Sequence, residues 1–394
     1  MHVIGWCEEV IMDALLDIGR FFINPAFYIA LLTAVLLGYF RVKRERKMFR
    51  TRIVWGWTEF SGLLKDGAVF ILIYSLVFCA LGLVVPLEWL VALSLISILM
   101  MVTGFFYFGS FVYIALAAVI FGWLFKRNGW TIDFGIFEYG GYYLDWGWLV
   151  PVALIAGAFV IAEGILISKK GASSASPRRE NTSRGLMAAV YDVKRLWLIP
   201  VLIVVPGSLL DSYAPYWPQF TIGQSSFSFM LVPFIFAFQN RSRRTMPIYL
   251  FPKIGGLTWK LGIAIIVLAL GSFLWEPMAF VALVAGAAGR LAITLFFEIK
   301  ERQGNHAVTP QSMGVMIVDV LPDSPADKMG LLKGEVIRKV NGLSVSNETE
   351  LYEAIQVNAA HCRLEVLDHN REVRLRQHVI FRHDHHRLGL IVVN

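Results

Sequence analysis

The chain has 394 residues, of which 57% are hydrophobic and 16% are charged, and its formal net charge is +7. A water-soluble protein of this length carries roughly a quarter of charged residues and no long apolar runs, so the composition excludes a wholly soluble protein. Because the hydrophobic excess lies before residue 297, we expect a polytopic α-helical membrane protein with a soluble C-terminal region.

Seven to nine membrane spans are expected, and we favour nine, because a helix needs about 17 to 25 apolar residues to cross a bilayer. The clear candidates are residues 21–40, 67–87, 146–168, 257–275 and 277–297. The run at residues 89–125 is too long for one span, so we expect two helices with a tight turn at residues 104–109. Residues 196–210 and 227–238 contain prolines, which predict kinked helices or re-entrant segments.

Lysine and arginine residues collect in three short loops, at residues 41–52, 169–195 and 241–244. Such loops usually face the cytoplasm. A nine-span path with the N-terminus outside places all three clusters and the C-terminal region in the cytoplasm. An even number of spans with the N-terminus inside is the alternative. The net charge then reflects topology and attraction to the lipid bilayer, and we expect no nucleic-acid binding.

Two linkers and an anchor are expected along this path. Residues 171–183, rich in Ser, Ala, Pro and charges, indicate a flexible cytoplasmic loop. Residues 301–312 connect a membrane region, residues 1–300, to a domain at residues 313–394. The start of the chain does not have the pattern of a cleaved secretory signal, so its first apolar helix is expected to act as a signal anchor.

The reactive residues argue against catalysis in the membrane. Of eight histidines, only His2 precedes residue 306, so the His-Glu-x-x-His zinc site of an intramembrane metalloprotease and a Ser–His dyad both lack their histidines. The cysteines Cys7, Cys79 and Cys362 have no paired spacing, which argues against a disulfide framework or a thiolate metal site. We therefore expect no enzyme, no cofactor, no catalytic residue and no metal.

Two features inside the expected spans are more typical of helix packing than of a substrate site. Glu163 and Arg290 lie near the predicted cytoplasmic ends of their spans, where long side chains snorkel or pack. The small residues at Gly286 to Gly289 permit close contact between helices.

The C-terminal region reads as alternating strands and helices. Ser324 and Pro325 are the expected N-cap and first residue of a short helix, and Asn347 followed by Glu350 predicts the start of a second helix that ends at Val357. Strands are expected at residues 314–320, 334–340, 363–367 and 373–377.

This region resembles a PDZ domain of the bacterial type found in HtrA-like and tail-specific proteases. The resemblance rests on the strings VLPDSPA at residues 320–326, GEVI at residues 334–337 and VNG at residues 340–342. In that family the loop that binds a peptide carboxylate comes early in the domain. Here the matching string RLGL lies at residues 387–390, so the resemblance implies a circularly permuted, α+β PDZ domain.

The resemblance implies a groove for protein or peptide C-terminal tails. A glycine between two large apolar residues lets successive backbone N–H groups approach a carboxylate, which places the carboxylate site at Leu388, Gly389 and Leu390. Leu388 and Leu390 would line the pocket for the last side chain, and the strand with Ile391 and Val392 would pair with the tail. Tyr352 and Ile355 would form the opposite wall. The alternative is that residues 388–393 form only a closing core strand.

A histidine-rich string, HDHH at residues 383–386, precedes this site. Imidazole and carboxylate groups are potential metal ligands, but the string is more typical of a solvated loop beside the carboxylate site.

The layout of many spans followed by a permuted cytoplasmic PDZ domain resembles the MinJ family, division-site topological factors of Gram-positive rods. The resemblance implies a membrane adaptor that links the polar scaffold DivIVA to the division inhibitor MinD, so that septa form at midcell. It also implies residence in the plasma membrane at poles and division septa, with other divisome components as further partners. The alternative function is an accessory that presents protein tails to a separate protease or secretion system.

Overall fold

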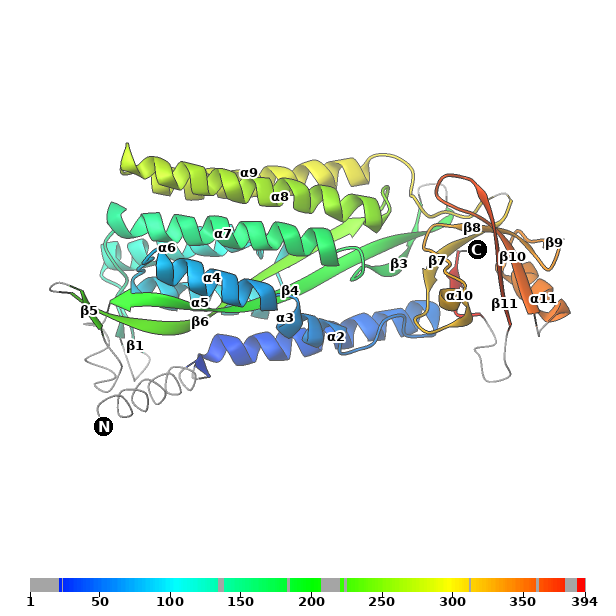
Figure 1. Ribbon diagram of the computed structural model, residues 1–394, viewed down its shortest axis with the longest axis horizontal. Helices are drawn as coiled ribbons and strands as arrows, with labels where there is room; N and C mark the ends of the chain where they lie inside the picture. The colour runs from blue at the N-terminus through cyan, green and yellow to red at the C-terminus, as the bar shows by residue number, and fades with distance from the viewer. Residues whose placement is uncertain are drawn as a thin grey trace.

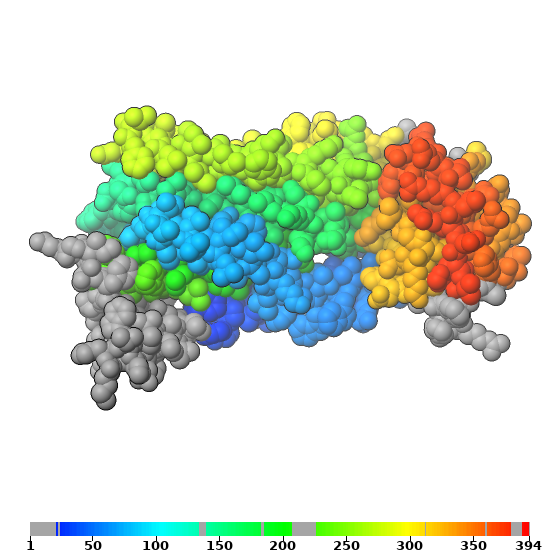
Figure 2. All heavy atoms as spheres, viewed as in Figure 1, coloured from blue at the N-terminus to red at the C-terminus, as the bar shows by residue number. Residues whose placement is uncertain are grey.

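The computed structural model describes residues 21–22, 24–133, 138–182, 185–206, 220–222, 225–311, 313–358, 361–379 and 388–393. Long helices lie side by side along the long axis of an elongated molecule, and the C-terminal domain covers one end of them (Figures 1 and 2). Within the described residues, six helices are long and apolar enough to cross a membrane, and a seventh is shorter.

These helices correspond to seven of the nine expected spans. They are α2 (Pro25–Phe49), α4 (Ala68–Ala80), α5 (Leu87–Thr103), α6 (Phe111–Asn128), α7 (Trp146–Lys170), α8 (Pro247–Leu270) and α9 (Met278–Arg302), with α3 (Thr58–Lys65) leading into α4. The expected division of residues 89–125 is confirmed, because α5 ends at Gly104 in a left-handed C-cap and the short helix η1 (Phe106–Phe108) precedes α6. Helix η3 (Gly271–Phe273) follows α8, and strands β1 (Ile132–Asp133) and β2 (Glu138–Tyr139) form a small hairpin.

The remaining two expected spans are strands, so the prediction of kinked helices is wrong. Strands β4 (Met187–Pro206) and β6 (Ser225–Ser242) pair antiparallel through residues 191–206 and 227–242, and Pro200 faces Pro233. A facing pair of prolines suits a non-hydrogen-bonded position, where both backbone nitrogens point to the outer sides of the hairpin. In a helix each proline removes a hydrogen bond, whereas here neither does.

Helices surround this hairpin and satisfy its outer edges. The backbone N–H of Leu202 donates to the Ser75 hydroxyl of α4 at 3.0 Å, and that of Ala237 donates to the carbonyl of Gly109 at 2.7 Å. Most side chains of β4 are buried. Non-helical backbone is stable at membrane depth only when protein covers it, and the helices provide that cover.

The segment at residues 171–183, expected to be a flexible loop, contains a strand. Strand β3 (Ser176–Asn181) pairs with residues 187–192 of β4, and β5 (Phe220–Ile222) completes a sheet of order β3-β4-β6-β5. The first basic cluster is likewise not a loop, since α2 continues through it to Phe49. The buried Arg41 explains this continuation, because it pairs with Glu45 one turn on, at 3.0 Å, and with Glu59 of α3.

Glycines allow α7 and α8 to pack backbone against backbone. A Cβ atom at Gly164 would lie 2.7 Å from the carbonyl oxygen of Gly255, and one at Gly157 would lie 3.0 Å from that of Gly262. The predicted small-residue contact on α9 is also present, since a Cβ at Gly286 would meet Ile265 of α8. Close backbone approach gives dispersion contacts that substitute for the weak hydrophobic effect between helices in lipid.

Glu163 and Arg290 pair with each other rather than snorkelling. The Glu163 carboxylate of α7 is fully buried and accepts hydrogen bonds from Arg290 Nε at 3.0 Å and Nη2 at 2.9 Å. The Ser110 hydroxyl donates to the other carboxylate oxygen. The pair is thereby a buried ionic link between α7, α9 and the start of α6.

The C-terminal domain contains the predicted order of strands and helices. Its elements are β7 (Val315–Val320), α10 (Pro325–Lys328), β8 (Val336–Val340), β9 (Leu343–Ser344), α11 (Glu348–Val357), β10 (His361–Leu367), β11 (Val373–Val379) and β12 (Leu390–Val392). Both predicted N-caps are confirmed, because the Ser324 hydroxyl accepts from the Asp327 N–H and the Asn347 side chain from the Glu350 N–H. The sheet order is β11-β10-β8-β7-β12, so the last strand of the chain is an edge strand.

Candidate functional site: a groove beside the last strand

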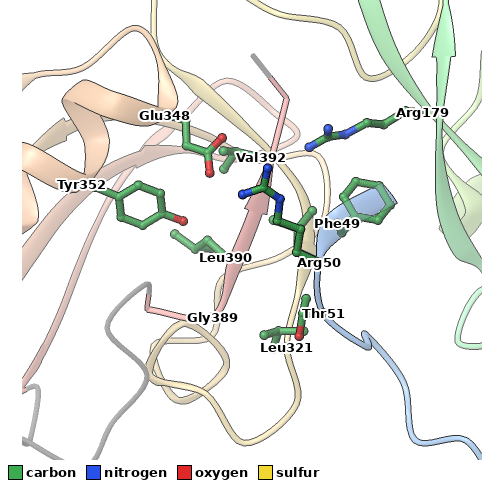
Figure 3. Close-up of a pocket in the computed structure, with 11 residues that line it drawn as sticks. Phe49, Arg50, Thr51, Arg179, Leu321, Glu348, Tyr352, Gly389, Leu390 and Val392 are labelled. Atoms are coloured by element: carbon green, nitrogen blue, oxygen red, sulfur yellow. The ribbon is translucent and has the colours of Figure 1, made fainter. Parts of the chain in front are cut away.

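A groove of about 330 Å³ runs along β12 between the C-terminal domain and the membrane region (Figure 3). Helix α11 contributes one wall and the end of α2 contributes the other. The lining residues are Phe49, Arg50, Thr51, Arg179, Leu321, Glu348, Tyr352, Gly389, Leu390, Ile391 and Val392. The groove is therefore built from parts of the chain that lie more than 300 residues apart.

Most of the predicted site residues meet here. Gly389, Leu390, Ile391 and Val392 line one side, and Tyr352 lines the other. Two predicted residues do not line the groove. The side chains of Leu388 and Ile355 are instead buried in the core of the C-terminal domain.

Sequence reasoning missed six lining residues, two of which have a signal in the sequence. Leu321 lies in the string VLPDSPA that carries the PDZ resemblance. Glu348 lies four residues before Tyr352, so helical spacing places both on one face of α11. By contrast, the membrane-region residues have no sequence relation to the domain; they are Phe49, Arg50, Thr51 and Arg179.

The backbone carbonyl groups of Leu388 and Gly389 point toward the segment between β7 and α10. Both residues have positive φ, 52° and 77°. The carbonyl of Leu388 accepts from the Ala326 N–H at 3.0 Å, and that of Gly389 accepts from the Leu321 N–H at 2.8 Å. Because a trans peptide is planar, the N–H groups of Gly389 and Leu390 point the opposite way, away from the segment between β7 and α10.

Gly389 was expected to let backbone N–H groups approach a carboxylate, but the structure shows a different need for glycine, which is close packing against Ser324. A Cβ atom there would lie 2.2 Å from Cβ and 2.5 Å from Oγ of Ser324, the N-cap of α10. Its positive φ adds strain for any other residue. The glycine thus permits close packing of the loop on α10, which holds the loop in place.

Strand β12 is buried on both faces. Leu390 and Val392 pack into the core of the C-terminal domain, whereas Ile391 and Val393 pack into the core of the membrane region. This alternation follows from the period of two along a strand. It places the edge strand at the junction between the two regions.

Hydrogen bonds complete this junction. The buried Tyr191 hydroxyl of β4 donates to the carbonyl of Val318 at 2.7 Å. The Ala189 N–H donates to the carbonyl of Val308 at 3.0 Å, which ties the segment between α9 and β7 to the membrane region. The C-terminal domain is therefore docked rather than hanging from a free linker.

One buried carboxyl lies beside the groove strand. Asp319 of β7 faces Ile391 of β12 and is 1% exposed. Burial raises the pKa of Asp319, and the Lys333 ammonium at 2.8 Å opposes that rise. The pair links β7 to the loop before β8.

The three basic clusters converge at the end that bears the C-terminal domain. Asp192 of β4 receives one arginine from each cluster: Arg44 at 3.0 Å, Arg178 at 3.7 Å and Arg241 at 2.5 Å. Asp66 similarly pairs with Arg195. The clusters thus carry structural ion pairs in addition to their excess positive charge.

The His, Cys, Asp and Glu residues that the structure describes form no metal site. No group of three or more His, Cys, Asp or Glu side chains suited to a metal occurs among the described residues. The string at residues 383–386 lies outside them. Cys79 and Cys362 are free thiols, and burial raises the pKa of Cys362 to about 11.

Comparison with known proteins identifies both the domain and the whole chain. A PDZ domain family matches residues 316–368. Serine protease HTRA1 of Xenopus laevis is 44% identical over 43 residues, 11% of this chain and 9% of that protein. The family match ends before the loop at Leu388.

The similarity to division proteins extends further along the chain. The probable cell division topological determinant MinJ of Lacticaseibacillus paracasei is 27% identical across 61% of this chain and 65% of that protein. The cell division topological determinant MinJ of Bacillus subtilis (strain 168) is 30% identical across 99% of this chain and 96% of that protein. With a membrane region of apolar helices followed by a C-terminal PDZ domain, the chain belongs to the MinJ family of cell division topological determinants.

Proposed function

We propose that this protein is a non-enzymatic membrane adaptor in division-site selection. The observation that carries the proposal is the similarity to the Bacillus subtilis determinant along almost the whole length of both chains. The adaptor links the polar scaffold DivIVA to the division inhibitor MinD, so that septa form at midcell. Its membrane region holds the PDZ domain at the plasma membrane, at the poles and at division septa.

The distribution of charge supports a cytoplasmic PDZ domain. Arginines from all three basic clusters meet at Asp192. Figure 1 shows the end of α2 and strand β3, which carry two of these clusters, at the same end of the molecule as the PDZ domain. Lysine and arginine near the ends of spans favour the cytoplasmic side. DivIVA and MinD would then meet the domain on that side.

The groove along β12 is proposed to bind C-terminal tails of partner proteins. The N–H groups of Gly389 and Leu390 point away from the segment that anchors their carbonyls, which suits them to donate to a terminal carboxylate. Strand β12 is the last strand of its sheet, so an extended tail can add to its edge. Tyr352 on α11 would contact the side chains of the tail.

The absence of an enzymatic role is supported by the sequence. Only His2 precedes residue 306, which leaves the spans without an imidazole for a metal or a nucleophile. A PDZ domain is itself a protein-interaction module.

Loss of the protein in dividing cells tests the proposed role. Deletion should give long cells and misplaced septa, and a fluorescent fusion of the intact chain should concentrate at poles and new septa. Normal division with altered proteolysis or secretion, together with a uniform membrane signal, would contradict the proposal and favour the accessory role.

The groove is tested separately in the complemented deletion strain. Tyr352→Ala should abolish capture of a partner that depends on the PDZ domain, because it removes an aromatic wall. Glu353→Ala is the matched control, since Glu353 is the exposed next residue on the same helix and does not line the groove. Equal capture by both variants would place partner binding on the membrane region.

A further inference from the structure

The wall of the groove that faces the PDZ domain belongs to the membrane region. Phe49, Arg50 and Thr51 come from the end of α2, and Arg179 comes from β3. Ile391 and Val393 bury their side chains in the membrane region. This packing holds the four membrane-region residues beside β12, so they are part of the groove. A tail bound along β12 would lie against both regions.

Local structure directs both arginines to this position. Arg50 is the C-cap of α2, with a φ of 58° and its backbone N–H bonded to the Arg46 carbonyl at 3.0 Å. This left-handed residue ends the helix at the groove. On β3, Arg178 pairs with Asp192, and alternation along the strand directs Arg179 to the opposite face. The Arg179 guanidinium lies 5.0 Å from the centre of the Phe49 ring.

Arg50 and Arg179 are exposed arginines, and they differ from the buried or half-buried arginines around them in their ion pairing. Buried or half-buried arginines at this end of the molecule are neutralised by carboxylates; they are Arg41, Arg44, Arg178, Arg195, Arg241 and Arg243. Arg50 and Arg179 form no ion pair within the part of the chain that the structure describes. Glu348 is the one acidic residue of the lining, so the groove carries an excess of positive charge.

The charge lies over one part of the groove. In Figure 3 the guanidinium groups of Arg50 and Arg179 and the carboxylate of Glu348 lie toward Val392, whereas Gly389 marks the other end. A tail whose carboxylate meets Gly389 and which adds antiparallel to β12 would place its preceding residues toward Val392. The arginines would therefore face side chains upstream of the terminal carboxylate.

We infer that the groove selects protein tails that carry an acidic side chain a few residues before the terminal carboxylate, and that Arg50 and Arg179 of the membrane region set this selectivity. The inference rests on the proposed tail-binding function and adds the chemistry of the tail. It makes the membrane region a part of the recognition site as well as an anchor.

The test uses the full chain in nanodiscs of zwitterionic lipid. The probes are labelled hexapeptides that end in Val, Leu, Phe or Ala, each with Glu or Gln at the third to fifth positions from the carboxyl end. Each peptide is also made with an amidated C-terminus. Glu-bearing tails should bind about two- to five-fold more tightly than Gln-bearing tails, as expected for exposed ion pairs.

Charge-reversal variants test whether Arg50 and Arg179 cause the preference for Glu-bearing tails. Arg50→Glu and Arg179→Glu should each reduce the preference for Glu-bearing over Gln-bearing tails, and the double variant should abolish or invert it. Arg50→Lys should retain most of it. The control is Arg52→Glu, because Arg52 is exposed nearby but does not line the groove.

Three results would overturn the inference. Equal binding of Glu and Gln tails by the native chain would exclude acidic selectivity while leaving tail binding intact. Failure of every free-carboxylate tail to bind better than its amidated form would refute the tail-binding function itself. Reduced binding of the two variants to vesicles of anionic lipid, with no change in tail preference, would assign the arginines to the membrane surface.

Discussion

At the scale of single residues, glycines with positive φ differ in what surrounds them. Gly389 and Gly330 have φ values of 77° and 67°. A Cβ atom at Gly330 would meet nothing within 4 Å, whereas one at Gly389 would overlap Ser324. A substitution at Gly330 therefore tests backbone strain alone, whereas one at Gly389 tests backbone strain together with a steric clash.

Gly389→Ala should weaken the PDZ domain more than Gly330→Ala. Both variants carry the strain of an L-residue at positive φ, but only Gly389→Ala must also displace α10, a cost of about 1–3 kcal/mol. Hydrogen exchange of β7 and β12 in the full chain measures the difference. Equal loss of protection in both variants would show that Ser324 yields without cost.

Asp368 gives the β10–β11 turn a dependence on pH. Its carboxylate accepts from the N–H groups of Asn370 at 2.8 Å and Glu372 at 2.9 Å and pairs with Arg374 at 2.7 Å. The bond from Glu372 is the main cause that lowers the pKa of Asp368 below its ordinary value of 3.8. A lowered pKa stabilises the fold above that value, and the stabilisation is lost as the pH falls through the folded-state pKa.

Asp368→Asn should remove this acid sensitivity. Protection of β10 and β11 from hydrogen exchange, corrected for intrinsic rates, should fall between about pH 5 and pH 3 in the native chain and change less in the variant. Glu372→Gln is the control, since the exposed Glu372 contributes its backbone N–H rather than its side chain. An unchanged pH profile in Asp368→Asn would assign the sensitivity to another group.

At the scale of elements, helices α7 and α8 form the most closely packed helix pair described above. Gly255 and its neighbour Gly256 lie on the same turn of α8 but face different surroundings. A Cβ atom at Gly255 would lie 2.4 Å from the Gly164 carbonyl oxygen, whereas the nearest atom to one at Gly256 would be Trp259 Nε1 at 4.0 Å.

Gly255→Ala should destabilise the membrane region, and Gly256→Ala should not. The first change forces two backbones apart at a cost of about 1–3 kcal/mol, and the second gains up to about 1 kcal/mol of helix propensity. Thermal unfolding of the full chain in detergent micelles compares them. If both variants melt at the native temperature, the backbone contact is looser than the geometry indicates.

At the scale of the whole molecule, docking of the PDZ domain on the membrane region fixes the position and the lining of the groove. The Tyr191 hydroxyl reaches across the junction to Val318, and Ile391 and Val393 are buried on the membrane-region side. The groove consequently has a fixed position relative to the end of the membrane region. A bound ligand would therefore be held close to that end, whereas a PDZ domain on a flexible linker would carry its ligand over a range of distances.

Tyr191→Phe should loosen this junction. The change leaves the Val318 carbonyl without its hydroxyl partner, which costs about 1–3 kcal/mol for a buried group. Faster hydrogen exchange in β7 is the measurement. Tyr142→Phe is the control, because that hydroxyl bonds to Ala118 within the membrane region, at 2.6 Å, and its loss should leave β7 unaffected. Equal exchange of β7 in both variants would contradict the docking role of Tyr191.

Particular elements show how far the sequence predicted the fold. Helices α5 and α6 and the caps at Ser324 and Asn347 carry local signals, and their prediction was confirmed. The β4–β6 hairpin was missed because an apolar run with prolines has no period that separates a buried strand from a kinked helix. At the groove, the resemblance to PDZ domains pointed to the lining residues Gly389 and Tyr352, whereas nothing in the sequence pointed to Arg50 and Arg179.

The sequence by itself determined the division into a membrane region and a PDZ domain, because solvent preference depends on composition and PDZ turns depend on local backbone chemistry. Only the tertiary structure decided that β12 is shared between them and that two arginines line its groove. Contacts between residues so far apart along the chain depend on how the packed elements meet, and no local pattern encodes that meeting.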